Sequence, residues 1–127
     1  WWIADYRSRF VGPAGDAAAR ERLVLESIVY LLMANVQRLD RAPRRVLLAG
    51  GLAGRADLRQ WLADALGLPV DVPADREATL RGLLAMLSPA VLDADPQFVR
   101  VEPDADARAG WRERQARWES LLLEGYR

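Results

Sequence analysis

Three residue types that carry much of enzyme chemistry are missing from this sequence. It contains no histidine and no cysteine, and all 18 of its basic residues are arginine. The chain therefore offers no thiolate nucleophile, no histidine-based triad and no zinc site of the usual nitrogen and sulfur ligands. It also offers no lysine for a phosphate loop or a Schiff base. Carboxylates, hydroxyls and the backbone remain for any chemistry.

Net charge and long apolar runs are also lacking. The 18 acidic residues balance the 18 basic ones, so no net field draws the chain to nucleic acid or to an anionic membrane. Neither a signal peptide nor an apolar run of membrane-spanning length is present, and we therefore expect a cytoplasmic protein. The sequence opens with Trp1 and Trp2 and without methionine, which leads us to expect a piece of a longer protein.

Hydrophobic periodicity predicts one α/β domain with four helices and two or three short strands. Asp16 is placed to cap a first helix over residues 16–39. This helix is apolar on two faces, because one stripe of Val24, Ile28, Leu31 and Leu32 is joined by a second one of Leu25, Val29 and Met33. We expect the second stripe to be covered by strands that this chain lacks or by a partner domain. If it is uncovered, the isolated chain should form a symmetric dimer through it or through the aromatic N-terminus.

The middle of the chain has a strand, helix, strand pattern, which implies a right-handed parallel crossover. Residues 46–49 are a short apolar run typical of a buried parallel strand. An amphipathic helix follows over residues 58–66 and ends at Gly67. The second strand, within residues 68–73, is bracketed by Pro69 and Pro73, so we expect it near an edge. So few strands cannot cover four helices, and part of the sheet is expected to lie outside this chain.

The C-terminal half completes the pattern. A helix with a leucine stripe over residues 80–87 is predicted to start at Asp75, and Gly82 within it suggests close approach by a backbone or a ligand. A short strand at residues 98–101 and a last helix from Asp104 follow. The last helix has Trp111, Trp118 and Leu122 on one side, which we interpret as packing rather than as a base-stacking platform.

Two adjacent glycines stand where the first strand hands over to its helix, and this junction carries the functional hypothesis. The carboxyl end of a parallel strand is the usual ligand position in α/β folds, and glycines there let a ligand lie against the main chain. Gly50, Gly51 and Gly54 fit that role. A tight turn alone would also explain the bare pattern.

The surrounding sequence resembles the C-terminal domain of the FGGY carbohydrate kinases, the glycerol kinase and xylulokinase group. The blocks ESIVYLLMANVQRL, VLLAGGLAGRADLRQWLADALGLPVDVP, EATLRGLLAML and WRERQARWE agree with it in order and spacing. The resemblance covers essentially the whole chain, and its most specific part is residues 50–72. The matching positions are Gly50, Gly51, Gln60, Ala63, Asp64, Gly67, Pro69, Val70, Glu77, Thr79 and Gly82.

This resemblance implies an actin-like ATPase fold of the ribonuclease H type. Residues 1–127 would form the C-terminal, nucleotide-binding domain of a two-domain kinase that uses ATP and Mg²⁺ on a sugar or polyol. The backbone of Gly51 and Leu52 would pack against the adenine, and Gly50 and Gly54 would belong to the same nucleotide-binding site. Arg55 stands where the family usually has Asn or Ser near the base or ribose. An arginine stacks or pairs with phosphate but accepts no hydrogen bond, so a solvated arginine is the alternative there.

The catalytic aspartate of the family lies in a Gly-Asp-Gln motif, which this sequence does not contain. Four aspartates read as helix-start residues, namely Asp57, Asp75, Asp104 and Asp106. Asp64 faces away from the apolar stripe, and no aspartate is assigned to catalysis. The acidic pairs Asp93 with Asp95 and Asp75 with Glu77 are interpreted as solvated rather than as metal ligands. We therefore expect the chain alone to be inactive. A degenerate kinase or another actin-like ATPase, or a non-catalytic α/β interaction module, remain as alternatives.

Overall fold

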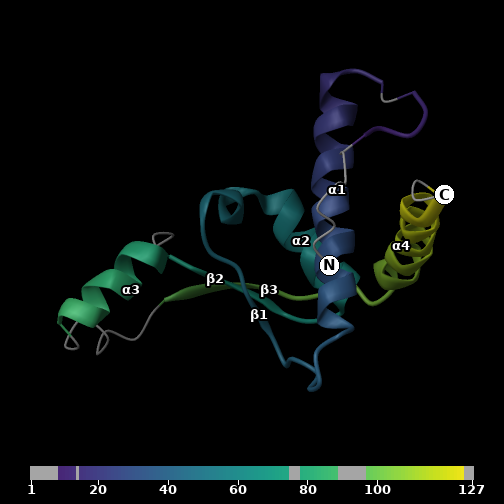
Figure 1. Cartoon of the computed structure of the whole chain (residues 1–127). Coiled ribbons are helices and arrows are strands. Elements are labelled where there is room, and N and C mark those ends of the chain that lie inside the picture. The colour runs from purple at the N-terminus through teal and green to yellow at the C-terminus, as the bar shows by residue number, and fades with distance from the viewer. Residues whose placement is uncertain (1–8, 14, 75–77, 89–96, 125–127) are drawn as a thin grey trace.

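A computed structural model of the chain describes residues 9–13, 15–74, 78–88 and 97–124. Among these residues the chain forms helices, short strands and one 3₁₀ turn, which is labelled η1 (Figure 1). In chain order the elements are α1 (Ala17–Val36), β1 (Val46–Leu47), η1 (Gly51–Gly54), α2 (Ala56–Leu66), β2 (Val70–Pro73), α3 (Ala78–Leu87), β3 (Phe98–Val101) and α4 (Ala107–Glu124). None of these helices is long and apolar enough to cross a membrane.

The ends of the first two long helices follow the predicted capping chemistry. The Asp16 side chain accepts a hydrogen bond from the Ala19 backbone N–H at 2.9 Å, which satisfies one of the free donors at the start of α1. Helix α2 ends at Gly67, whose φ of 63° lies in the left-handed region that glycine adopts without strain. The N–H groups of Gly67 and Leu68 both bond to the carbonyl of Ala63.

The strands form one sheet in the order β1-β2-β3. Strands β1 and β2 are parallel, with Val46 opposite Val70, and α2 makes the crossover between them as predicted. Strand β3 pairs antiparallel to β2, with Val70 opposite Val101. The expectation that β2 lies near an edge is wrong. Pro69 precedes the strand and Pro73 is its last residue, so the missing proline N–H groups leave the ladder between them intact.

Strand β1 lies at one edge of the sheet among the described residues, and it is less buried than its apolar sequence indicates. The Leu47 side chain is 60% exposed, whereas Val70 on β2 is fully buried. Prediction and structure differ because a continuous apolar run indicates cover on both faces, whereas the described part of the chain covers only one face at Leu47. This exposure agrees with the expected incomplete sheet.

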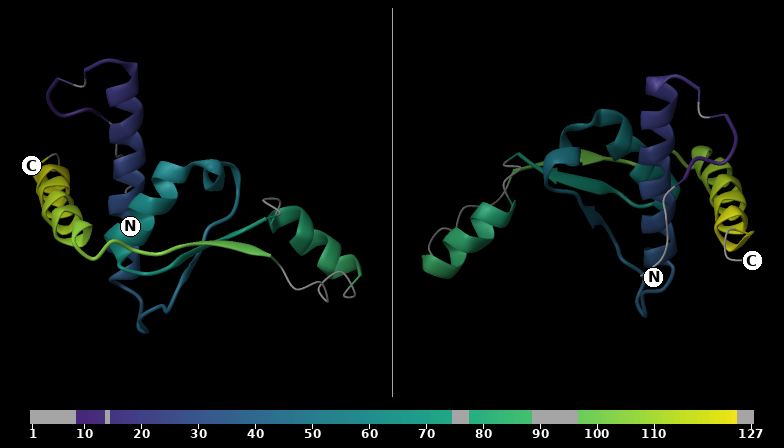
Figure 2. Two further views of the ribbon diagram at one scale, coloured as in Figure 1. Left: turned by 180° about the vertical axis from the view of Figure 1, so that it is seen from behind. Right: turned by 45° about the horizontal axis from the view of Figure 1, so that its top comes forward.

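Helices α1, α2 and α4 gather toward one end of the sheet, while α3 lies at the other end (Figures 1 and 2). The core at the three-helix end is built around aromatic rings. Tyr30 of α1 lies 5.9 Å from Trp111 and 5.7 Å from Trp118 between ring centroids, and Trp61 of α2 lies 6.0 Å from Trp111. Trp111 is only 4% exposed. The tryptophans of α4 therefore pack inside the domain, as the sequence indicated.

The prediction of which α1 face lacks cover is wrong. Leu25, Val29 and Met33 are 5%, 0% and 2% exposed, because they face this chain's own core. The opposite stripe is the open one, with Val24 49% and Leu31 39% exposed. Both stripes are apolar at helical spacing, so periodicity alone cannot assign the inner one.

Helix α3 contributes little to the core. Its leucines Leu80, Leu83 and Leu84 are 54%, 55% and 42% exposed. A Cβ built on Gly82 would meet no atom within 4 Å. The predicted close approach of another backbone to this glycine is therefore not found among the described residues. Asp75 and Glu77, the acidic pair expected before this helix, lie outside the described residues.

The surroundings of Asp64 and the start of α4 add to and correct the sequence analysis. Asp64, which is expected to face away from the apolar stripe of α2, is buried and only 6% exposed. Its Oδ1 accepts hydrogen bonds from Gln60 Nε2 at 2.7 Å and from the Asp104 backbone N–H at 2.8 Å. Helix α4 starts at Ala107 rather than at Asp104. Asp64 thus fixes the loop that leads into α4, a role that depends on a contact across 40 residues of sequence.

Candidate functional site

The glycine junction after β1 adopts a conformation that its first glycine permits. Gly50 has φ 92° and ψ −173°, a region that residues with a side chain avoid. The Gly50 carbonyl then accepts a hydrogen bond from the Ala53 N–H at 3.0 Å, and the chain turns through η1 into α2. A side chain at position 50 would therefore strain the turn.

Gly51 has no such local reason to be glycine. Its φ is not positive, and a Cβ built on it would meet no atom within 4 Å. Neither backbone conformation nor packing among the described residues excludes a side chain here. Gly50, Gly51, Leu52 and Gly54 are all exposed, with Leu52 at 45%. They leave a strip of open main chain on the surface of the turn.

The turn is anchored from its inner side. Ala53, in the middle of η1, is fully buried in the core that α2 and β2 share. Arg59, one turn into α2, donates from Nε to the Ala53 carbonyl at 2.5 Å. The exposed strip is therefore presented by a turn whose buried side is fixed, as a binding surface requires.

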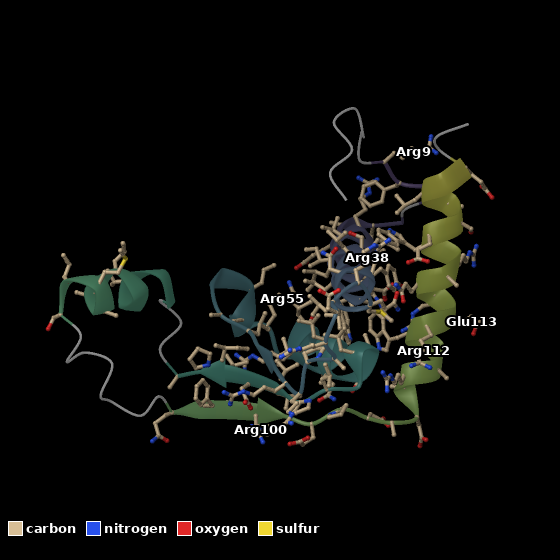
Figure 3. All side chains as sticks on the ribbon, turned by 60° about the horizontal axis from the view of Figure 1, so that its bottom comes forward. Arg9, Arg38, Arg55, Arg100, Arg112 and Glu113 are labelled. Atoms are coloured by element: carbon tan, nitrogen blue, oxygen red, sulfur yellow. The ribbon has the colours of Figure 1, made fainter. Side chains whose placement is uncertain are left out.

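Arg55 is the residue between the turn and α2, and its guanidinium is engaged by two carboxylates. Its Nε and Nη2 donate to the two oxygens of Asp57 at 3.0 Å and 2.7 Å, and its Nη1 pairs with Glu21 of α1. The bidentate pair with Arg55 lowers the pKa of Asp57 to about 2, and the two carboxylates raise the pKa of Arg55. Figure 3 shows Arg55 beside the start of α2.

These contacts account for an arginine at an unfavourable position. The start of a helix carries partial positive charge, which opposes a cation there. Asp57 offsets this because it also accepts a hydrogen bond from the Leu58 N–H at 2.9 Å. The sequence shows Asp57 two residues after Arg55, but nothing in the sequence indicates Glu21, which is 34 residues away. A contact between Arg55 and a ligand stays a prediction.

Buried acids elsewhere in the described residues have structural partners. Asp71, in the middle of β2, has a side chain only 1% exposed and pairs with Arg100 at 2.7 Å and with Arg45 at 3.2 Å. The hydrogen bonds from Arg100 are the main reason that the pKa of Asp71 is lowered. No three acidic side chains in the described part of the chain come together to hold a metal ion. Asp93 and Asp95 lie outside it.

Comparison with known proteins identifies the family to which this sequence is similar. Residues 14–92 match the family model for the FGGY family of carbohydrate kinases, C-terminal domain. Over 88 residues the chain is 31% identical to a glycerol kinase of Trichormus variabilis, and the match covers 65% of this chain. The chain spans only 18% of the length of that curated relative.

Solved structures show the fold. A xyloylose kinase from Brucella ovis is similar with a TM-score of 0.73 and 22% identity, over 98% of this chain and 29% of that one. A gluconate kinase from Lactobacillus acidophilus is similar with a TM-score of 0.72 and 18% identity, over 97% of this chain and 28% of that one. The predicted α/β fold, a helix-rich actin-like ATPase domain, is confirmed, and the described residues contribute a small sheet of three strands to it.

Proposed function

Because the chain belongs to the FGGY family of carbohydrate kinases, we propose that it is the nucleotide-binding half of an enzyme that phosphorylates a sugar or polyol. Residues 1–127 would form the C-terminal domain, and a preceding domain would hold the carbohydrate and the catalytic aspartate. The reaction would transfer the γ-phosphoryl group of ATP to a substrate hydroxyl. This assignment also favours the cytoplasm, where ATP is supplied.

The observation that carries the proposal is the unexplained glycine at position 51. Its conformation is open to any residue and the space above it is empty of described atoms, so the fold itself does not call for glycine. A flat ligand lying on the main chain would require glycine, because a side chain at position 51 would occupy the space that the ligand needs. We propose that the adenine of ATP lies on Gly50, Gly51, Leu52 and Gly54.

Arg55 would border this surface, and its engagement with Asp57 and Glu21 suggests a supporting role. The two carboxylates hold the guanidinium in place and tie the start of α2 to α1. An arginine held in this way is a poor replacement for an asparagine that reads the base. This observation favours the second candidate function, a kinase-like protein that has lost tight ATP binding.

Mg²⁺ would act in the complete enzyme by neutralising charge on the transferred phosphoryl group. The described residues offer no acidic cluster for it, so we propose that its ligands are the ATP phosphates and the preceding domain. Because the sequence contains no Gly-Asp-Gln motif for the catalytic aspartate, this chain alone should form no sugar phosphate from ATP, Mg²⁺ and a panel of polyols.

The exposed α1 stripe points to a covering partner. Val24, Leu31 and Leu32 lie on one face of α1 at helical spacing and are 49%, 39% and 36% exposed. We propose that the preceding domain covers this stripe in the complete kinase, and that the isolated chain buries it by forming a dimer. Trp1 and Trp2, the other predicted contact, lie outside the described residues.

The adenine assignment is tested in the full-length kinase by Gly51→Leu. Because a Cβ at position 51 would meet no described atom within 4 Å and the residue is exposed, the enzyme should fold and keep its Michaelis constant for the carbohydrate, while the Michaelis constant for ATP rises by about tenfold or more. Gly110→Ala on α4, whose Cβ would meet only Arg114 Nη1 at 3.3 Å, is the control and should leave both constants unchanged. Unaltered ATP kinetics in a folded Gly51→Leu enzyme would refute the assignment. A wild-type protein with no ATP turnover would instead support the degenerate kinase.

A further inference from the structure

A small pocket lies where α1 and α2 end and α4 begins, at the far end of α2 from the glycine turn. Its volume is about 90 Å³. Its apolar side is formed by Met33, Val36 and Leu66, and its polar side by Gln37, Arg108 and Arg112. Helix α2 has 11 residues, so this pocket and the glycine turn are about 16 Å apart along its axis. The pocket is therefore separate from the surface proposed to hold adenine.

Arg108 presents a buried donor with no acceptor. Its Nε is shielded from solvent and forms no hydrogen bond with any described residue. The guanidinium lies directly over Gly67, where a side-chain Cβ would come within 2.6 Å of its Cζ. Gly67 thus leaves the room in which the guanidinium sits. A buried cationic donor of this kind requires an acceptor, which either water or a bound anion supplies.

Arg112 brings a second guanidinium to the same pocket. It follows Arg108 by four residues on α4, so the two side chains lie on one face of the helix. Like charges at this spacing repel, yet no carboxylate lines the pocket and no described residue pairs with either arginine. Figure 3 shows Arg112 on the lower part of α4, with Glu113 apart from it.

The carboxyl ends of α1 and α2 neutralise only part of this charge. Each helix end carries about half a unit of negative charge, which gives about one unit for the two together. The two guanidinium groups carry two units of positive charge. The pocket therefore keeps an excess of positive charge, with Arg108 partly buried against the apolar wall and Arg112 exposed at the rim.

We propose that this pocket binds a single phosphate group. Two guanidinium groups from one helix face present forked donors that suit a phosphate. Pockets for whole drug-sized ligands hold about 300–1,000 Å³, so a pocket of about 90 Å³ admits the phosphate group and leaves any attached molecule outside. The proposal is independent of the adenine site.

The experiment titrates the purified chain with inorganic phosphate at constant ionic strength and follows its backbone amide resonances. We expect saturable shifts at Gly67 and at the start of α4, with a dissociation constant of about 1 mM or below. Arg108→Gln and Arg112→Gln should each weaken binding at least about tenfold. Arg117→Gln, an exposed arginine on α4 outside the pocket, is the matched control and should bind as the wild type does.

Several results would overturn the proposal. Shifts that grow linearly without saturation would show non-specific binding, and equal affinity in the two pocket variants would place the anion elsewhere. Equally tight binding of acetate would contradict a phosphate site. If Arg108 only neutralises the carboxyl end of α2, Arg108→Gln lowers stability while the wild type shows no saturable binding. If that variant does not fold, Arg112→Gln decides by itself.

Discussion

Gly50 and Gly51 are neighbours that the structure predicts to respond in opposite ways to the same substitution. Gly50→Ala places a Cβ on a residue with φ 92° and ψ −173°. Such a conformation costs about 1–3 kcal/mol for a residue with a side chain. Because that Cβ would meet no atom within 4 Å, the expected loss is conformational strain alone. At about 4 °C per kcal/mol for a domain of this length, the unfolding midpoint should fall by about 4–12 °C.

Gly51→Ala should leave stability unchanged or raise it slightly. Gly51 opens the short helix η1 with an ordinary φ, and its Cβ would also lie in open space. Replacing a glycine by alanine at a compatible position reduces the freedom of the unfolded chain and stabilises by about 0.4–1 kcal/mol. Thermal and urea unfolding of the two variants would measure the difference. A Gly51→Ala loss above about 1 kcal/mol, or a neutral Gly50→Ala, would refute the conformational assignment of the turn.

Three further predictions concern the core, the ion pair and the open helix face. Leu58→Ala, at a side chain 1% exposed, should lower the free energy of unfolding by about 2–5 kcal/mol, whereas Leu83→Ala on exposed α3 should cost less than about 0.5 kcal/mol in the same urea titration. The pKa of Asp57 is about 2 when folded against 3.8 ordinarily, so its stabilising contribution is present above pH 3.8 and is lost as the pH falls toward 2. Arg55→Gln should remove that loss, and an unchanged slope in acid denaturation would contradict it. Leu31→Glu should convert a dimer of the chain into a monomer by light scattering, and a wild-type chain that is already monomeric would count against the dimer.

Much of the fold follows from local rules in the sequence. The Asp16 cap, the stop at Gly67 and the parallel crossover through α2 all come from short-range patterns, and each is present in the structure. The glycine turn was located for the same reason, since a strand followed by two glycines and an amphipathic helix is readable within one stretch. The ligand of this turn cannot be predicted from the local pattern, because a tight turn without a ligand would have the same glycines.

What the sequence could not supply depends on contacts between distant segments. Asp71 is an acid within an apolar strand, but its partners Arg45 and Arg100 lie 26 and 29 residues away. The burial of Asp64 depends on a backbone N–H 40 residues away. The covered face of α1 was misjudged because both of its stripes are apolar, and only the positions of α2 and α4 decide between them.

The pocket lined by Arg108 and Arg112 also depends on contacts that the sequence does not indicate. Arg108 and Arg112 are four residues apart and readable as one helix face, but their convergence with Gly67 requires α2 to end beside the start of α4. From the sequence alone they read as part of a charged, solvated helix. The structure indicates a candidate anion site because the Nε of Arg108 is buried and has no hydrogen-bond acceptor among the described residues.

The central claim is that the exposed main chain of the glycine turn receives the adenine of ATP. The most direct measurement is a titration of the isotope-labelled chain with ADP, followed through the backbone amide resonances. We predict that the largest saturable shifts fall on residues 50–55 and that Gly51→Leu abolishes them while the rest of the spectrum keeps its native dispersion. Largest shifts on any other surface of the chain, or unchanged binding by Gly51→Leu, would contradict the account.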